Sequence, residues 1–170
     1  MGSGKSTIGP ILANAIGFDF VDTDRMVEGR MGKSVQAIFH ELGEEHFREI
    51  ERTVVLELVA KTKLVISLGG GTLADPVNFA SIHEAGILIY LKAGPEQLYR
   101  RLHQKTDRPV LRSPDGGRLS DADLQGRIEE LHRLRAPVYE KADFIIETDD
   151  VRVGITVDQI VKKISRYLQS

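Results

Sequence analysis

Four short apolar runs, separated by helical patterns, constrain the fold of this chain most. The runs cover residues 18–22, 64–68, 87–91 and 143–147. Three of them are almost continuously apolar, which is typical of strands that are covered on both faces. Strands that alternate with helices form βαβ units, so the sequence predicts an α/β domain with a parallel sheet.

The helical patterns between these runs have recognisable ends. Gly17 is a stop signal for the first helix, and Asp75 followed by Pro76 is a typical start. Ser120 begins a capping pattern, and we expect Thr156 to cap the last helix. The sequence therefore predicts helices over 5–16, 44–61, 76–85 and 120–135, and one that follows Thr156.

Length and composition favour a single soluble domain over residues 1–170. The chain has no cysteine, which excludes a disulfide framework, a thiolate metal site and a cysteine nucleophile. No run approaches the ~18 apolar residues that a transmembrane helix needs. The net charge of −2 argues against a general nucleic-acid binder. The five histidines lack metal-ligand spacing, and Ser67 lacks the context of a nucleophile.

Positive charge is concentrated in residues 100–135. This stretch holds eight of the fourteen arginines together with Lys105, against six acidic residues. A local cationic segment in a slightly acidic chain indicates a small anionic ligand, although a solvated arginine-rich helix face is the alternative. Within it, residues 106–120 contain two prolines and two glycines, which predicts a mobile lid, with a surface insertion as the alternative.

The most specific motif is Gly2-Ser3-Gly4-Lys5-Ser6-Thr7, which opens the first helical pattern. Its glycines allow backbone N–H groups to surround phosphate oxygens at a helix N-terminus. In such a loop the lysine reaches the β- and γ-phosphates, and the serine hydroxyl binds Mg²⁺. The sequence therefore predicts a P-loop that binds nucleotide through residues 2–7.

Two further clusters follow predicted strands. Asp22 and Asp24 come at the end of the first strand, and Gly69-Gly70-Gly71 follows the second. Ligands of open parallel sheets bind beyond the carboxyl ends of the strands. We expect Asp22 to hold a water on Mg²⁺ and Asp24 to accept a proton or hydrogen bond from the attacking hydroxyl, with helix capping as the alternative for Asp24.

Three arginines join these clusters as candidates: Arg48, Arg108 and Arg135. A guanidinium group binds carboxylate or phosphate with two parallel hydrogen bonds. Each of them alone would be read as a surface residue, and only their combination with the P-loop makes them candidates for binding.

The order of these motifs resembles shikimate kinase. The resemblance rests on GSGKST, DTD seventeen residues after the lysine, and then FREIE, SLGGGT, DRPVL and RAPVY, which together span essentially the whole chain. It implies a three-layer P-loop kinase with strand order 2-3-1-4-5, a substrate-binding segment at about 24–62 and a lid at 106–120. It also implies a cytoplasmic, monomeric transferase that phosphorylates the 3-hydroxyl of shikimate with ATP and Mg²⁺ in aromatic amino-acid biosynthesis.

The resemblance also assigns roles by position. Lys5, Asp24 and Arg108 fall on catalytic positions, and Ser6 and Asp22 on metal positions. The positions that contact shikimate are Asp24, Phe47, Arg48, Gly70, Gly71 and Arg135. The positions that contact ATP are Gly2, Ser3, Gly4, Lys5, Ser6, Thr7, Arg101, Arg108 and Arg152.

The chain departs from this pattern in two ways. Pro10 lies inside the first helix, where proline can cost about 3 kcal/mol or kink the helix. A complete P-loop also has a strand and a first glycine, five positions before Gly4, that this sequence does not contain. In the order 2-3-1-4-5 the absent strand is the middle one, so we expect two half-sheets with unpaired edges and a chain shortened from a longer working kinase.

Two alternatives stay open at this stage. Another small-molecule P-loop kinase, such as a gluconate-type kinase, would share Lys5 and the lid arginine but would not need Arg48, Gly70 and Arg135. The other alternative is a non-catalytic relative that binds nucleotide or a partner, although the presence of Lys5, Asp24 and Arg108 argues against it.

Overall fold

A computed structural model describes residues 2–103 and 119–168. Its strands are β1 (Asp19–Asp22), β2 (Leu64–Ser67), β3 (Ile89–Lys92) and β4 (Phe144–Glu147). Its helices are α1 (Lys5–Ile16), α2 (Thr23–Met31), α3 (Val35–Val59), α4 (Pro76–Ala85), α5 (Pro95–Leu102), α6 (Asp121–Tyr139) and α7 (Val153–Ile164). Short 3-10 turns cover Thr72–Ala74 and Ser165–Tyr167.

The strands form two parallel pairs. β1 pairs with β2, with Asp19 opposite Leu64, and β3 pairs with β4, with Ile89 opposite Phe144. Within the described part of the chain, the two pairs are separate sheets. This arrangement confirms the predicted α/β fold with parallel strands, and it matches the expectation of two half-sheets.

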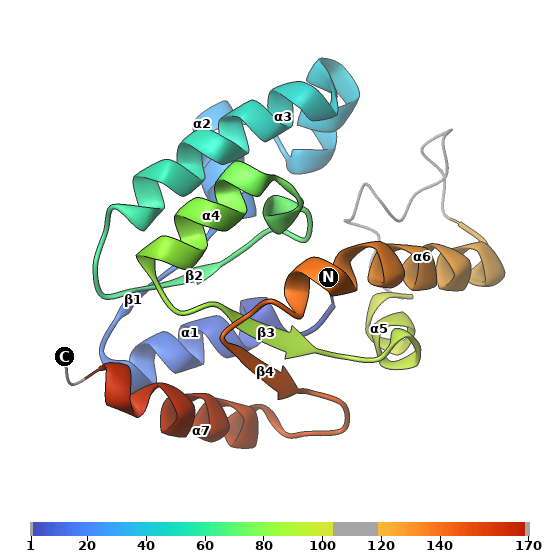
Figure 1. Cartoon of the computed structure of the whole chain (residues 1–170). Coiled ribbons are helices and arrows are strands. Elements are labelled where there is room, and N and C mark those ends of the chain that lie inside the picture. The colour runs from blue at the N-terminus through green and yellow to red at the C-terminus, as the bar shows by residue number, and fades with distance from the viewer. Residues whose placement is uncertain (1, 104–118, 169–170) are drawn as a thin grey trace.

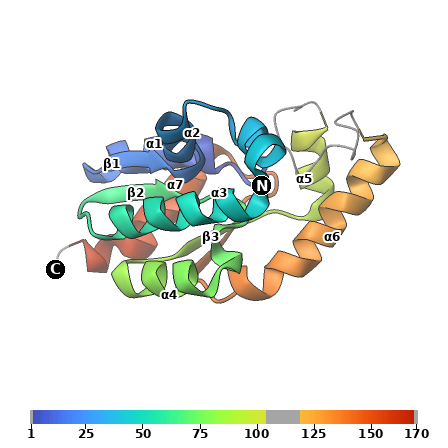
Figure 2. The same cartoon turned by 90° about the horizontal axis from the view of Figure 1, so that it is seen from above.

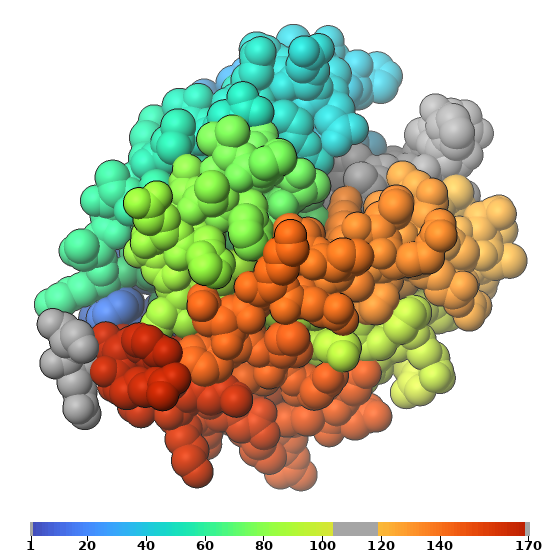
Figure 3. Space-filling view, in the orientation of Figure 1, coloured from blue at the N-terminus to red at the C-terminus, as the bar shows by residue number. Residues whose placement is uncertain are grey.

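Helices cover both faces of the strands and form three layers (Figures 1 and 2). In Figure 1, α1 and α7 lie below β1 and β2, while α2, α3 and α4 lie above these two strands. One apolar cluster joins α1 and α7 to β3 and β4, and a second joins α2 and α3 to β1 and β2. A third cluster lies between α5 and α6, and α4 and α6 are neighbours on the surface in Figure 3.

Most of the expected helix ends are confirmed. α1 ends at Gly17, which has a left-handed φ of 71°, and the side chain of Asp75 accepts hydrogen bonds from two N–H groups at the start of α4. Ser120 caps α6 as expected. Pro10 lies on the exposed side of α1, and the helix continues through it.

Some expectations need correction. Thr156 does not cap the last helix, because α7 already begins at Val153 and the Thr156 hydroxyl donates inside the helix to the carbonyl of Arg152. Threonine readily makes this bond to the fourth residue before it, so the residue type alone does not fix a helix start. The helix expected over 44–61 is the second half of α3, which bends at Gly43 and ends at Val59. α6 runs on to Tyr139, past the expected end at residue 135.

Gly9 is required where α1 crosses β1. A Cβ atom at this position would lie 2.3 Å from Cε2 of Phe20, whereas a Cβ at Gly126, on the exposed side of α6, would meet no atom within 4 Å. We expect Gly9→Ala to lower the free energy of unfolding by about 1–3 kcal/mol. Gly126→Ala should raise it by roughly 0.5–1 kcal/mol, because alanine is the better helix former. Urea unfolding of both variants tests this; equal stabilisation by the two alanines would contradict the packing of α1 on β1.

Candidate active site

A cavity of about 570 Å³ lies where the strands end. It is lined by residues at or just after the carboxyl ends of β1, β2 and β4, so these strands point in the same direction. Five cationic side chains line it, namely Lys5, Arg48, Arg100, Arg101 and Arg135, together with three acidic ones, Asp22, Asp24 and Glu51. The excess of positive charge suits an anionic ligand.

The start of α1 forms one wall of this cavity. Gly2 and Gly4 have left-handed φ values of 71° and 99°, which favour glycine. Gly4 stands at the N-cap of α1, where no side chain caps the helix and no acidic residue lies in the first turn. The N-terminus of α1 therefore offers positive potential and backbone N–H groups to an anion, next to the ammonium group of Lys5.

The turn after β1 is tied to the turn after β2 by Thr23. This buried residue donates from its hydroxyl to the carbonyl of Ser67 at 3.3 Å and accepts from the N–H of Gly69 at 2.9 Å. Asp22, rather than Asp24, is the N-cap of α2, accepting from the N–H of Arg25 at 3.3 Å. Asp24 lies in the first turn of α2 and lines the cavity, so helix capping does not account for it.

Arg48 is held by two carboxylates of its own helix. It donates to Glu51 at 2.7 Å and to Glu44 at 2.9 Å. Glu51 is 1% exposed and also accepts from the hydroxyl of Thr72 at 2.7 Å, whereas the side chain of Glu44 is 65% exposed. Burial lowers the pKa of Arg48, but the hydrogen bonds and charges of Glu51 and Glu44 outweigh it and raise the pKa, so Arg48 stays protonated.

Two phenylalanines form an apolar wall beside Arg48. Phe47 is buried, with its ring centre 5.2 Å from Cζ of Arg48, and the ring centre of Phe39 lies 6.0 Å from the same atom. Both rings line the cavity. They restrict the side chain of Arg48 and strengthen its charged contacts by excluding water.

The glycine turn after β2 is anchored to α6. The hydroxyl of Tyr139 donates to the carbonyl of Gly70 at 2.5 Å. Burial raises the pKa of Tyr139 against an opposing effect of the neighbouring Arg135, so the hydroxyl keeps its proton. The carbonyl of Gly70 is therefore engaged, and Arg135 lies next to this anchor at the edge of the cavity.

The three arginines that are expected to contact ATP, Arg101, Arg108 and Arg152, do not all lie at the cavity. Arg101 lines the cavity and donates to the carbonyl of Thr148 at 2.8 Å and to that of Gly2 at 3.3 Å, which links the P-loop to the end of β4. Arg152 is exposed at the N-cap of α7 and is not among the residues lining the cavity. Arg108 and most of the expected lid lie outside the described residues.

Oxygen ligands for Mg²⁺ are present in the cavity. The hydroxyl of Ser6 and the carboxylate of Asp22 both line it, and Mg²⁺ bound with substrate phosphates needs only one or two such protein ligands. Within the described ranges, no group of three or more His, Cys, Asp or Glu residues forms a metal cage. The donor set therefore fits a metal that is held mainly by phosphates and water.

Gly69 is the point at which three polar side chains converge. A Cβ there would lie 2.6 Å from Oδ1 of Asp24, 3.0 Å from Oγ1 of Thr72 and 3.1 Å from Oε1 of Glu51. We expect Gly69→Ala to lower kcat by about 10- to 100-fold, since it displaces Asp24 without removing any polar group. Gly86→Ala, where a Cβ meets nothing within 4 Å, is the matched control. An unchanged kcat for Gly69→Ala in steady-state kinetics would contradict this role.

One further contact of the site has a signal in the sequence. Glu51 lies three residues after Arg48, a spacing that places the two side chains on one helix face. Tyr139, Thr23 and Thr72 carried no such signal, because their roles depend on contacts between elements far apart in the chain.

Comparisons with known proteins point to one family. The shikimate kinase family model matches residues 1–168. The chain is 46% identical to the shikimate kinase of Chlorobium chlorochromatii over 169 residues, covering 99% of this chain and 89% of that protein. It is 46% identical to the shikimate kinase of Chlorobaculum parvum over 168 residues, covering 99% and 90%.

Solved structures give the same result. Shikimate kinase from Acinetobacter baumannii in complex with shikimate matches with a TM-score of 0.88 and 29% identity, over 98% of this chain and 89% of that one. Shikimate kinase from Bacteroides thetaiotaomicron matches with a TM-score of 0.88 and 32% identity, over 97% and 94%. Together with the motifs that meet in one cavity, these matches establish that the chain belongs to the shikimate kinase family.

Proposed function

We propose that this chain transfers the γ-phosphoryl group of ATP to the 3-hydroxyl of shikimate, giving shikimate 3-phosphate and ADP. The observation that carries this proposal is the composition of one cavity. It joins the P-loop, with Lys5, to two arginines suited to a carboxylate, Arg48 and Arg135, and to an aspartate, Asp24. A small hydroxylated carboxylate needs these groups, and family membership supports the assignment.

Phosphoryl transfer asks the protein mainly for positioning and for stabilisation of negative charge. The N–H groups of residues 2–7 and the ammonium group of Lys5 bind the phosphates. Arg48 and Arg135 bind the carboxylate of shikimate, with Gly70 and Gly71 beside it and Phe47 against the ring. Asp24 accepts the proton of the attacking hydroxyl. Arg101, Arg108 and Arg152 remain proposed ATP contacts.

We also propose that ATP is bound with Mg²⁺, held by Ser6 and, through water, by Asp22. When bound, Mg²⁺ neutralises charge on the phosphates. Closure of residues 106–120 would exclude water that otherwise hydrolyses ATP. We propose further that residues 1–170 form a single domain, with its substrate-binding segment at about 24–62. We expect this domain to act as a cytoplasmic monomer without nucleic-acid or membrane partners. No helix in the described part of the chain is long and apolar enough to cross a membrane.

An ADP-release assay with shikimate and gluconate as alternative acceptors tests this function. We expect ADP release that depends on shikimate and exceeds the rate with gluconate. Faster release with gluconate would favour the other small-molecule kinase. Thermal stabilisation by ATP and Mg²⁺ with no turnover on either acceptor would favour a non-catalytic binder.

The proposed function predicts that the carboxylate of Glu44 competes with the carboxylate of shikimate for Arg48. Because Glu44 is exposed and Glu51 is buried, the carboxylate of shikimate would replace Glu44 and leave the Glu51 contact intact. We expect Glu44→Gln to lower KM for shikimate by about two- to fivefold, because the substrate no longer has to displace an exposed ion pair, and such a pair contributes little free energy. Glu49→Gln on the same helix is the control, since Glu49 pairs with His46. A raised KM in Glu44→Gln would contradict the exchange.

A further inference from the structure

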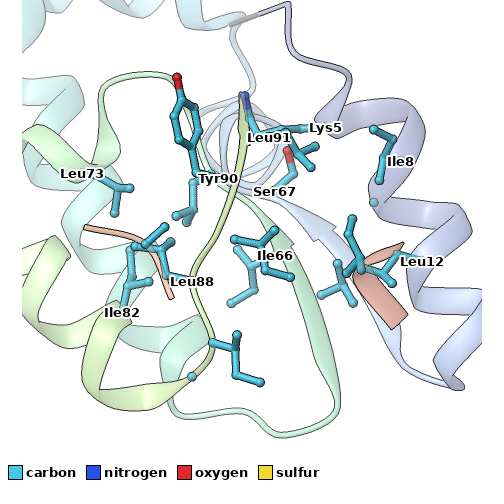
Figure 4. A pocket seen from close by; sticks show the side chains of 18 of the residues that line it. Lys5, Ile8, Leu12, Ile66, Ser67, Leu73, Ile82, Leu88, Tyr90 and Leu91 are labelled. Atoms are coloured by element: carbon cyan, nitrogen blue, oxygen red, sulfur yellow. The ribbon is translucent and has the colours of Figure 1, made fainter. Parts of the chain in front are cut away.

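Tyr139 lies behind the candidate active site. It belongs to α6 and lines a second cavity, of about 640 Å³, which Tyr90 of β3 also lines (Figure 4). The ring centres of the two tyrosines are 5.2 Å apart. Tyr139 is not among the residues that line the active-site cavity, so any effect that it has on a substrate passes through the groups that it contacts.

One of these groups is a peptide of the glycine turn. The hydroxyl of Tyr139 donates to the carbonyl of Gly70 at 2.5 Å. Because a trans peptide is planar, with its C=O and N–H on opposite sides, the N–H of Gly71 is directed away from Tyr139. Gly71 lines the active-site cavity, and a Cβ atom on it would lie 2.5 Å from a guanidinium nitrogen of Arg48. The contact therefore controls a donor that borders Arg48.

The other backbone groups of the glycine turn are held nearer by. The N–H of Gly69 donates to a threonine hydroxyl at the start of α2. The carbonyls of Gly69 and Gly71 accept from the N–H groups of Thr72 and Ala74. Within the described part of the chain, the N–H of Gly71 donates to no protein group. The Gly70–Gly71 peptide thus depends on α6 for its orientation, and its N–H is available to a ligand.

Backbone sterics do not fix this orientation. Gly71 has a φ of −113°, and reversal of the peptide before it would turn φ by half a circle into the positive range. Glycine adopts positive φ about as readily as negative φ, so the hydrogen bond from Tyr139 selects one of the two orientations. Burial raises the pKa of Tyr139, which keeps the hydroxyl proton in place for this bond.

We propose that Tyr139 is a positioning residue for the carboxylate of shikimate, because its hydroxyl holds the N–H of Gly71 toward the space between Arg48 and Arg135. The N–H then donates to the carboxylate that the two guanidinium groups bind, and hydrogen bonds to a charged acceptor are the strong ones. This inference rests on the proposed function. Arg135 also acts on the Tyr139 hydroxyl through its charge and a hydrogen bond, so the test must separate the two routes.

An NMR titration of the ¹⁵N-labelled protein makes this separation. The unchanged chain and Tyr139→Phe are each titrated with shikimate and with its methyl ester, which lacks the negative charge. We expect Tyr139→Phe to raise the dissociation constant of shikimate about tenfold and that of the ester less than about twofold. In the unchanged chain, shikimate should move the amide proton of Gly71 downfield, and Tyr139→Phe should abolish this shift. Tyr90→Phe, which removes the neighbouring phenol hydroxyl, is the matched control and should behave as the unchanged chain.

Each other outcome decides against the proposal. Weaker shikimate binding with the Gly71 shift retained would assign the effect to Arg135. Equal weakening of shikimate and ester, or an equal loss in Tyr90→Phe, would assign it to general loosening of the packing. If Tyr139→Phe does not fold, the unchanged chain still decides, because an amide proton of Gly71 that shikimate leaves in place overturns the proposal. No binding of shikimate by the unchanged chain would overturn the proposed function together with this inference, whereas binding that Tyr139→Phe leaves unaltered overturns the inference alone.

Discussion

Replacing Arg48 by alanine should lower kcat/KM for shikimate by about a hundredfold or more, the effect of losing two charge-assisted hydrogen bonds to a carboxylate. The same change should destabilise the fold. It leaves Glu51, 1% exposed, without the partner that it contacts at 2.7 Å. Because the side chain of Arg48 is itself 25% exposed, we expect a loss of about 2–3 kcal/mol, below the value for a fully buried pair.

A second variant separates binding from stability. Arg48→Ala combined with Glu51→Gln removes the unpaired buried charge, so it should recover most of the stability and none of the affinity for shikimate. Urea unfolding and calorimetric titration with shikimate measure the two effects. Recovery of shikimate binding in the double variant would contradict a direct contact between Arg48 and the substrate.

Lys5→Met should lower kcat by about 100- to 1000-fold, as for loss of one preorganised group that stabilises charge in the transition state. Lys5 is the first residue of α1 and lines the active-site cavity. Methionine keeps the length of the side chain and a strong preference for the helix, so the thermal midpoint should change little. Lys162→Met, on the exposed side of α7, is the control.

The split between kcat and KM is the informative readout for Lys5. A transition-state role predicts a loss in kcat and kcat/KM together. If Lys5→Met raised only KM for ATP, Lys5 would bind the ground state and transition state equally, and its catalytic assignment would be wrong.

Local patterns predicted the parts of this structure that depend on neighbours in the chain. Gly17, Asp75 and Ser120 end or start helices as expected, since caps are decided within a few residues. The prediction that Thr156 caps the last helix was wrong, because its hydroxyl makes a competing hydrogen bond inside the helix. The helices α2 and α5 were missed, because both are short and polar.

The candidate site also contains residues that local sequence patterns predict and contacts that only the folded chain shows. The glycines of residues 2–7 and the aspartates after β1 were readable, because strand ends and helix starts place them by topology alone. The bridge from Thr23 to Gly69 and the anchor from Tyr139 to Gly70 span 46 and 69 residues of sequence, so only the folded chain reveals them. The motifs indicated which residues meet, and these contacts explain how they are held.

Phosphorus NMR of the reaction mixture tests the central claim most directly. The protein is incubated with ATP, Mg²⁺ and shikimate, and Lys5→Met serves as the blank. We predict a phosphate monoester at the 3-hydroxyl of shikimate, formed together with ADP in equal amounts. Absence of this ester, in protein that unfolds cooperatively in urea, would contradict the proposed function.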